Sequence, residues 1–303
     1  MERTFSALPT PFLNGKIDFQ SLEKLIDFQV KNNIDGLVFS GSTGEGHNLS
    51  RDEWEGLIAF GVKTVDTKNK QYNKKAVVVA GCGFNSTILA VDYAKKANEL
   101  NVDYILATVP HYNKPQQDGI YQHFAEICKA VDTRIILYNV PSRTATDMKN
   151  ETIIRLVKDF KNIVALKDAT GVLTRVSDMK YKLNKIDRDD FVLLSGEDET
   201  QIGFNAMGGN GVISVVSNVF PSLCVEIQKL CENNDFLGVL SMQNKLTELS
   251  RAMFFEVNPV PVKYALKAIG IFETDDVRLP LMPASKECRE NIDNLIKKYK
   301  AQP

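Results

Sequence analysis

The sequence predicts an α/β protein, a (β/α)8 TIM barrel followed by a C-terminal helical extension. Short apolar runs alternate with longer amphipathic stretches eight times, at roughly 25 to 30 residues apiece, and such a barrel typically takes about 250 residues. No Gly-x-Gly-x-x-Gly turn follows the first apolar run, which disfavours the main competitor, a doubly wound open sheet. After Pro221 only helical patterns continue. We therefore expect a barrel domain over residues 1–232 and a helical domain over residues 233–303.

The strand candidates are short apolar runs of the type that forms strands buried on both faces. They lie at residues 4–8, 36–39, 76–80, 104–107, 135–138, 163–166, 191–194 and 211–215. The helix candidates gather apolar residues on one face, as at residues 19–32, 52–65, 86–100, 119–130, 149–158, 173–183 and 200–207. Four more follow the last strand, at residues 221–232, 236–252, 262–269 and 285–299. Ser50 with Glu53 three residues later fits a capping box.

Composition argues against several classes of partner. The chain has 37 basic and 38 acidic residues in 303, and a net charge of −1 gives no reason to expect nucleic acid or an anionic membrane. No apolar run is long enough to span a bilayer, and the N-terminus lacks the pattern of a signal peptide. Five scattered cysteines favour a reduced, cytoplasmic protein. Three dispersed histidines do not suggest zinc, and we expect no metal site.

Two residues at predicted strand ends could carry covalent chemistry, because barrel active sites form where the strands end. Lys167 follows the apolar run 163–166. Burial disfavours a charged ammonium, and a neutral amine can attack a carbonyl. The alternative is a lysine that extends its head into water. Tyr138 ends the preceding strand candidate and would point toward the same mouth, although tyrosine is also an ordinary strand residue.

Three further segments allow both a structural and a functional interpretation. The glycine loop, residues 41–46, contains Ser42 and Thr43 and is either a tight connection or an anion-binding site. Arg143 is either a surface charge or a carboxylate clamp. Residues 208–211 form either a turn or a phosphate loop. Together, a lysine, a phenol, a hydroxyl-rich loop and an arginine on one rim are what Schiff-base chemistry on a small anionic keto acid requires.

The chain resembles the dihydrodipicolinate synthase / N-acetylneuraminate lyase family of class I aldolases over nearly its full length. The matching segments are Leu8-Pro9-Thr10-Pro11-Phe12, Gly41-Ser42-Thr43-Gly44-Glu45, Tyr138-Asn139-Val140-Pro141, Ala165-Leu166-Lys167-Asp168 and residues 208–214. Residues 138–144, 110–121, 258–263 and 278–280 are similar to the synthase branch of the family.

The resemblance implies a lyase of lysine and diaminopimelate biosynthesis in which Lys167 forms an imine with pyruvate and no other cofactor is needed. Tyr138, Thr43 and Tyr112 would form a proton relay. Tyr112 would reach in from a neighbouring subunit, since the family usually forms homotetramers built as dimers of dimers.

The resemblance also implies the substrate-binding residues. Ser42 and Thr43 would lie beside the carboxylate of pyruvate. Gly196 and Ile213 would line the pocket through backbone groups. Arg143 would bind the carboxylate of aspartate semialdehyde, the second substrate.

Two other functions stay open at this point. A lyase acting on N-acetylneuraminate or another sugar-derived 2-keto acid is supported by Ser42-Thr43 and Asp198-Glu199. Arg143 opposes it, because a polyhydroxylated substrate needs neutral donors there. A non-catalytic keto-acid-binding barrel is the third possibility, since fold alone does not guarantee activity. It would be expected to lack the lysine or the tyrosine.

Overall fold

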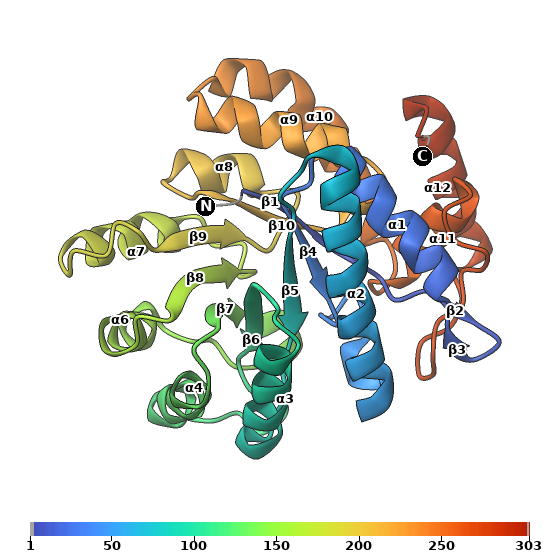
Figure 1. Ribbon diagram of the computed structural model, residues 1–303. Helices are drawn as coiled ribbons and strands as arrows, with labels where there is room; N and C mark the ends of the chain where they lie inside the picture. The colour runs from blue at the N-terminus through green and yellow to red at the C-terminus, as the bar shows by residue number, and fades with distance from the viewer. Residues whose placement is uncertain (1–2, 302) are drawn as a thin grey trace. The chain divides into compact units, whose positions relative to one another are not determined.

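The computed structural model describes residues 3–301 and residue 303. Parallel strands close into a barrel in the order β1-β10-β9-β8-β7-β6-β5-β4, as Figure 1 shows. The predicted (β/α)8 barrel is therefore confirmed. Met1 and Glu2, on which the expected absence of a signal peptide partly rests, lie outside the described residues.

All eight predicted barrel strands are confirmed. They are β1 (Thr4–Ala7), β4 (Gly36–Phe39), β5 (Val77–Gly81), β6 (Tyr104–Thr108), β7 (Arg134–Asn139), β8 (Ile163–Asp168), β9 (Val192–Ser195) and β10 (Gly211–Ser214). The end of β8 differs from the prediction, because Lys167 lies inside the strand and not beyond it. Asp168 still pairs with Asn139 on β7 and with Ser195 on β9, so the ladder continues past the apolar run.

Every predicted helix is present, with small changes at the ends. The helices between the strands are α1 (Phe19–Lys31), α2 (Arg51–Tyr72), α3 (Thr87–Glu99), α4 (Gln117–Ala130), α6 (Asn150–Asp159), α7 (Thr174–Asn184) and α8 (Gln201–Ala206). The later ones are α9 (Pro221–Glu232), α10 (Phe236–Met253), α11 (Val260–Ala268) and α12 (Lys286–Tyr299). The capping box is confirmed, because Ser50 Oγ accepts from the Glu53 amide and Glu53 accepts from the Ser50 amide.

Several short elements were not predicted, because they are too short to show a period. They are the hairpin of β2 (Phe12–Leu13) and β3 (Lys16–Ile17), the single turn α5 (Pro141–Thr144), and the 3-10 turns η1 (Gly46–Asn48) and η2 (Val216–Asn218). Pro141 opens α5, where its missing N–H and fixed φ suit the first turn of a helix.

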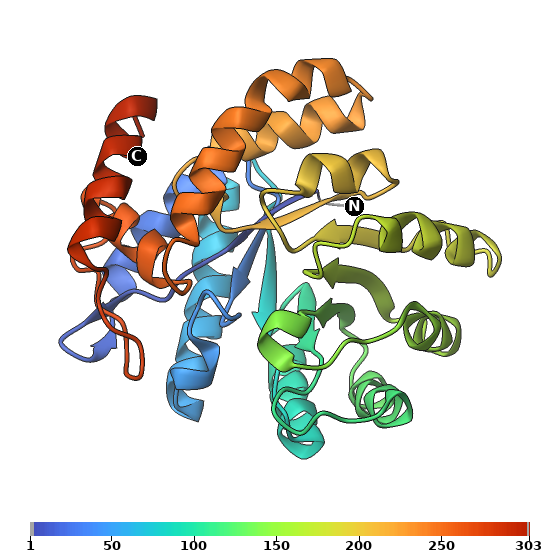
Figure 2. The same cartoon turned by 180° about the vertical axis from the view of Figure 1, so that it is seen from behind.

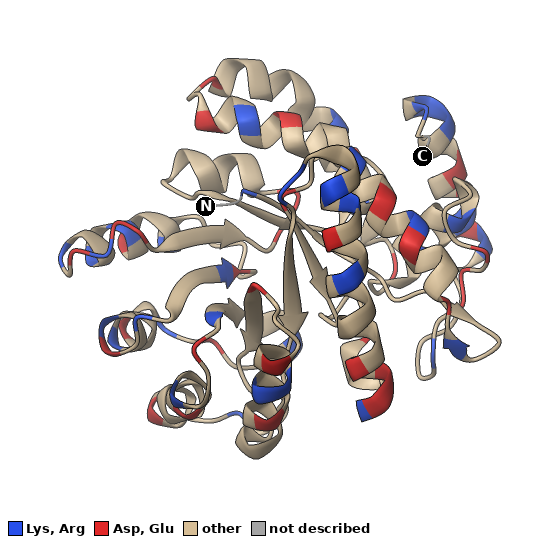
Figure 3. Cartoon of the chain, viewed as in Figure 1, with Lys and Arg blue, Asp and Glu red and all other residues tan. Residues whose placement is uncertain are grey.

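The described residues form two compact units. The first comprises Arg3 and residues 79–213. Its helices α3, α4, α6 and α7 lie outside strands β6 to β9 in Figure 1. Figure 3 shows that charges in this unit gather on helices and loops, whereas its strands are mostly uncharged. The end of β8 is an exception, because Lys167 and Asp168 follow each other there.

The second unit comprises residues 4–78, 214–301 and 303. In it β1 pairs with β4, and α1 packs on α2. Its later helices lie in pairs, α9 with α10 and α11 with α12, drawn in orange and red in Figure 2. A buried polar cluster joins its two parts, since Ser6 Oγ lies 2.6 Å from Gln29 Oε1 and 2.7 Å from Ser217 Oγ. The predicted domain boundary at residue 233 stays a prediction.

All five cysteines are buried free thiols. In the part of the chain that the structure describes, no helix combines the length and the apolar character needed to cross a bilayer.

Candidate active site

Lys167 is the centre of the candidate site. The residue is 7% exposed, and the barrel ladder places it directly beside Tyr138 of β7. Its Nζ lies 4.3 Å from the centre of the Tyr138 ring, and Tyr138 is itself only 5% exposed. The structure therefore brings the predicted amine and the predicted phenol together in a dry environment.

Burial increases the fraction of this amine that is neutral, and the neutral form is the nucleophile. Burial lowers the pKa of Lys167 from 10.5 to about 8, because the charged ammonium loses its hydration. The charges of Glu197 and Asp198 act in the opposite direction and raise the pKa, whereas Arg143 lowers it further. Two carboxylates thus limit the loss of positive charge without cancelling it.

Arg143 lies on α5, the turn that follows β7, and its side chain is exposed. Its charge also lowers the pKa of the nearby Glu197 carboxyl, which burial raises. Thr144 closes the turn, because its hydroxyl donates to Thr146 O at 2.8 Å. A short, hydrogen-bonded segment therefore presents the guanidinium, and its role as a clamp stays a prediction.

Gly196 and Ile213 belong to the same unit as Lys167. Ile213 is buried on β10, at 1% exposure. The Gly196 amide donates to Asp168 O at 2.7 Å, so the loop after β9 is tied to the end of β8. A Cβ on Gly196 would lie 2.6 Å from the Ala169 Cβ, which explains why glycine is required. Their predicted part in lining the pocket is not tested by this geometry.

Tyr112 differs in setting from Tyr138. It lies on the loop after β6, has a φ of 70° and is 86% exposed. A tyrosine so open to solvent is suited to contact another chain, but its predicted role in a neighbouring subunit's proton relay stays a prediction.

Ser42 and Thr43 lie in the second unit, within the glycine loop. Thr43 is 4% exposed, and its Oγ1 accepts a hydrogen bond of 2.9 Å from Asn258 Nδ2. Because that bond occupies the oxygen as an acceptor, the Thr43 hydroxyl proton is directed elsewhere as a donor.

Gly44 and Gly46 of this loop are needed for close approach and not for positive φ. The left-handed residues are Ser40 and Glu45, at φ of 56° and 49°. A Cβ on Gly44 would lie 2.9 Å from Ser40 N, and one on Gly46 would lie 2.2 Å from Ser40 O. The loop therefore folds back tightly on Ser40.

Residues that were not predicted as functional hold the glycine loop in place through contacts with Glu45. Lys263 Nζ forms an ion pair with Glu45, and both side chains are fully buried. Lys263 also donates to Asp276 O at 2.8 Å, and the Arg278 amide donates to Glu45 Oε2 at 3.0 Å. Burial lowers the pKa of Lys263 to about 8, while the Glu45 charge raises it. The only sequence signal was the similarity of residues 258–263 and 278–280 to the synthase branch.

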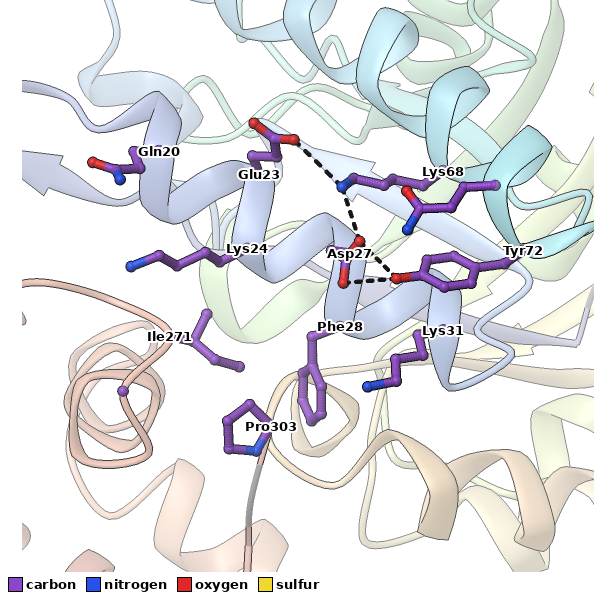
Figure 4. A pocket seen from close by; sticks show the side chains of 12 residues that line it. Gln20, Glu23, Lys24, Asp27, Phe28, Lys31, Lys68, Tyr72, Ile271 and Pro303 are labelled. Atoms are coloured by element: carbon purple, nitrogen blue, oxygen red, sulfur yellow. Dashed lines mark hydrogen bonds and ion pairs between the residues drawn. The ribbon is translucent and has the colours of Figure 1, made fainter.

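A hollow of about 710 Å³ in the second unit is a different kind of feature. Figure 4 shows Asp27 at its wall, where Tyr72 Oη donates to both carboxylate oxygens and Lys68 Nζ lies 2.9 Å away. Lys68 also lies 3.4 Å from Glu23. These contacts join α1 to α2, so we interpret the hollow as a helix-packing groove. Among residues 3–301 and 303, no cluster of three histidine, cysteine or carboxylate side chains could hold a metal ion.

Comparison with known proteins gives one consistent result. The model of the dihydrodipicolinate synthetase family matches residues 1–299. The 4-hydroxy-tetrahydrodipicolinate synthase of Bartonella bacilliformis is 43% identical over 97% of this chain and 96% of its own length. That of Rhizobium meliloti is 40% identical over 98% and 97%.

Solved structures give the same result. The crystal structure of dihydrodipicolinate synthase from Aquifex aeolicus superimposes with a TM-score of 0.93, at 36% identity and 99% coverage of both chains. A structure described as the first monomeric dihydrodipicolinate synthase variant has a TM-score of 0.94 and 36% identity, and covers 99% of this chain and 97% of that one.

Proposed function

This chain belongs to the dihydrodipicolinate synthetase family, and from that premise we propose that it has 4-hydroxy-tetrahydrodipicolinate synthase activity, condensing pyruvate with L-aspartate 4-semialdehyde. The observation that carries the proposal is the buried Lys167 amine, with a pKa of about 8, beside the Tyr138 ring. The enzyme would be a Schiff-base-forming lyase that needs no cofactor beyond its own lysine.

The first half of the reaction follows from this pair. The neutral Lys167 amine adds to C2 of pyruvate and gives a carbinolamine. Loss of water needs a proton on the leaving hydroxyl, and the Tyr138 phenol would relay it, a role supported by the 4.3 Å between Lys167 Nζ and the centre of the Tyr138 ring. Loss of a methyl proton from the resulting imine gives the enamine nucleophile. The proposed relay also includes Thr43 and Tyr112, and the Ser42–Thr43 segment would bind the carboxylate of pyruvate.

The second half uses the exposed guanidinium of α5. Arg143 would bind the carboxylate of the semialdehyde in a bidentate arrangement and present its aldehyde to the enamine. Carbon–carbon bond formation is followed by attack of the substrate's own amine on the imine carbon. That attack closes the ring, releases Lys167 and completes the cycle without a change in oxidation state. Backbone groups of Gly196 and Ile213 would line the pocket.

Borohydride trapping tests the covalent step. Incubation with pyruvate and borohydride should leave a reduced three-carbon adduct on Lys167, located by peptide mass spectrometry. Lys167→Ala should abolish it, and Lys158→Met, which changes an exposed lysine on α6, should not. Tyr138→Phe should slow trapping, with Tyr181→Phe as the control because Tyr181 is 60% exposed.

A coupled assay tests the second substrate separately. Turnover with aspartate semialdehyde is expected, and cleavage of N-acetylneuraminate is not. Adduct formation without semialdehyde turnover would refute the proposed substrate and leave the lysine chemistry standing. An adduct on a lysine other than Lys167 would refute the mechanism.

The assembly is a proposal of its own: a homotetramer, built as a dimer of dimers, in which Tyr112 serves a neighbouring chain. The 86% exposure of Tyr112 supports it, although one relative is described as a monomeric variant. Mixed oligomers of Tyr112→Phe and Lys167→Ala should recover about a quarter of the wild-type activity, because half of the random dimers hold one intact site. Recovery no greater than the two variants give alone would refute the shared site. We also propose a cytoplasmic location, supported by the five free thiols.

A further inference from the structure

A polar network centred on Arg175 of α7 includes the residues that directly follow Lys167 and Tyr138 in the sequence. Arg175 Nε donates to Asp168 at 3.2 Å, and one terminal nitrogen donates to Asp147 at 3.1 Å. The other terminal nitrogen donates to Met148 O at 2.9 Å. The remaining oxygen of Asp147 accepts from Asn139 Nδ2 at 2.7 Å. One guanidinium therefore bridges two carboxylates and a backbone carbonyl.

The network is well satisfied, and most of its members are shielded from solvent, whereas the side chain of Asp147 is 44% exposed. The side chains of Arg175 and Asp168 are 16% and 7% exposed, and Asn139 is fully buried. Asp168 Oδ1 accepts from the Thr170 amide at 2.9 Å, and Asn139 Oδ1 accepts from the Met148 amide at 3.0 Å. Three hydrogen bonds from one planar guanidinium to three different groups constrain its position more than a single surface ion pair would.

The groups joined by Arg175 adjoin the proposed active-site residues. Asp168 follows Lys167 on β8, and Asn139 follows Tyr138 on β7. Asp147 and Met148 end the segment 141–148, which carries Arg143. The ends of the two catalytic strands and the segment bearing the proposed substrate clamp are thus tied to a single side chain.

We propose that Arg175 is a positioning residue that fixes the Arg143 segment relative to the strand that bears Lys167, and so sets the affinity for the second substrate, a small aldehyde with a carboxylate. This inference rests on the proposed function. Arg175 does not touch the reacting atoms in this proposal, and it acts through Asp147, Met148 and Asp168.

The expected effect is selective for the second substrate. The groups that shift the pKa of Lys167 include Arg143, Glu197 and Asp198, and neither Asp168 nor Arg175 is among them. Loss of Arg175 removes none of these charges and only displaces Arg143, so pyruvate trapping should change by no more than about twofold. Loss of Arg175 should also free the segment 141–148 at one end. A substrate clamp misplaced by about 1 Å can lower the reaction rate by up to about 100-fold.

The test compares Arg175 variants with a matched arginine. Arg188 in the same unit is equally exposed, at 16%, and donates to two backbone carbonyls and to Asp190. Arg175→Met should raise KM for aspartate semialdehyde about tenfold or more, with the KM for pyruvate and the borohydride-trapping rate within about twofold of wild type. Arg175→Lys should show a smaller increase in the KM for aspartate semialdehyde, because lysine keeps the positive charge but lacks the planar group that donates to several partners at once. Arg188→Met should lower stability without changing either KM.

Two further measurements make the result decisive. Removing Arg175 leaves the buried Asp168 carboxylate without its cation, so the double variant Arg175→Met/Asp168→Asn separates that cost from positioning and should keep the raised KM. Hydrogen exchange of the peptide covering residues 141–148 should accelerate in Arg175→Met and in Arg175→Met/Asp168→Asn, and not in Arg188→Met. Equal changes for both substrates, or no change beyond that of Arg188→Met, would overturn the proposal. If the wild type itself fails to turn over semialdehyde, the proposed function fails instead, and the exchange result still decides whether Arg175 orders the segment.

Discussion

Raising the pH should accelerate imine formation on Lys167 only up to a plateau, with a midpoint of about 8. At pH 7 an amine with a pKa of about 8 is about 9% neutral, whereas one with a pKa of 10.5 is about 0.03% neutral. Burial thus enriches the reactive form about 300-fold, which corresponds to about 3.4 kcal/mol. Between pH 7 and 9 the rate should rise about tenfold and then level off.

The assay is single-turnover trapping with pyruvate and excess borohydride, quenched at intervals across pH 6 to 11. Two variants should move the midpoint in opposite directions. Glu197→Gln removes a charge that raises the pKa of Lys167, so its midpoint should fall. Arg143→Met removes a charge that lowers this pKa, so its midpoint should rise.

Two results would contradict the reasoning. A rate that keeps rising in proportion to hydroxide beyond pH 10 would mean that the amine is not desolvated before pyruvate binds. Shifts of the same sign in both variants would mean that their charges do not act on Lys167 in the way the structure indicates. A plateau with the expected pair of shifts would support both burial and local charge as causes.

Three stability predictions follow from other buried or paired groups. Lys263→Met leaves the Glu45 carboxylate buried without its cation and should lower the free energy of unfolding by about 3–5 kcal/mol, measured by urea denaturation at pH 7. The double variant Lys263→Met/Glu45→Gln should regain most of this stability, and an equal loss in both variants would contradict the reasoning. The Arg278 guanidinium lowers the pKa of Glu53 to about 2, so the ionised carboxylate stabilises the fold above pH 4.5. This contribution is about 1–2 kcal/mol after solvent screening, and it should vanish as the pH falls through 2. Glu53→Gln should abolish that part of the acid sensitivity in pH-dependent melting. Burial lowers the pKa of His123 from 6.5 to about 4, so acidification from pH 6.5 to 4 should lower the free energy of unfolding by up to about 3.4 kcal/mol. In the same pH-dependent melting experiment, His123→Asn should lose less stability over this range.

The elements that the sequence predicted well are those with a local signal. The barrel strands are apolar runs that need no knowledge of distant residues, and the Ser50–Glu53 capping box lies within four residues. Lys167 and Tyr138 were predicted to lie at the same barrel mouth because neighbouring parallel strands end on the same rim, and the two residues are paired in the ladder of β7 and β8.

The elements that the sequence did not predict depend on pairing between distant residues. Arg175 and Asp147 are 28 residues apart, and nothing in either local segment indicates the other. The end of β8 was placed two residues early, because Lys167 and Asp168 are charged and only neighbours on both sides keep them in the ladder. The roles predicted for Ser42, Thr43 and Tyr112 came from motif similarity and not from a local pattern.

The ion pair between Glu45 and Lys263 joins two segments that leave the ribosome far apart in time. Glu45 emerges from the ribosome 218 residues before Lys263 and 233 residues before Arg278, and Thr43 emerges 215 residues before Asn258. A nascent chain interrupted before residue 258 would already contain Lys167 and Tyr138, yet its Thr43 segment would lack all three of these late contacts. The glycine loop would therefore gain its last hydrogen bond only after residue 278 has been synthesised.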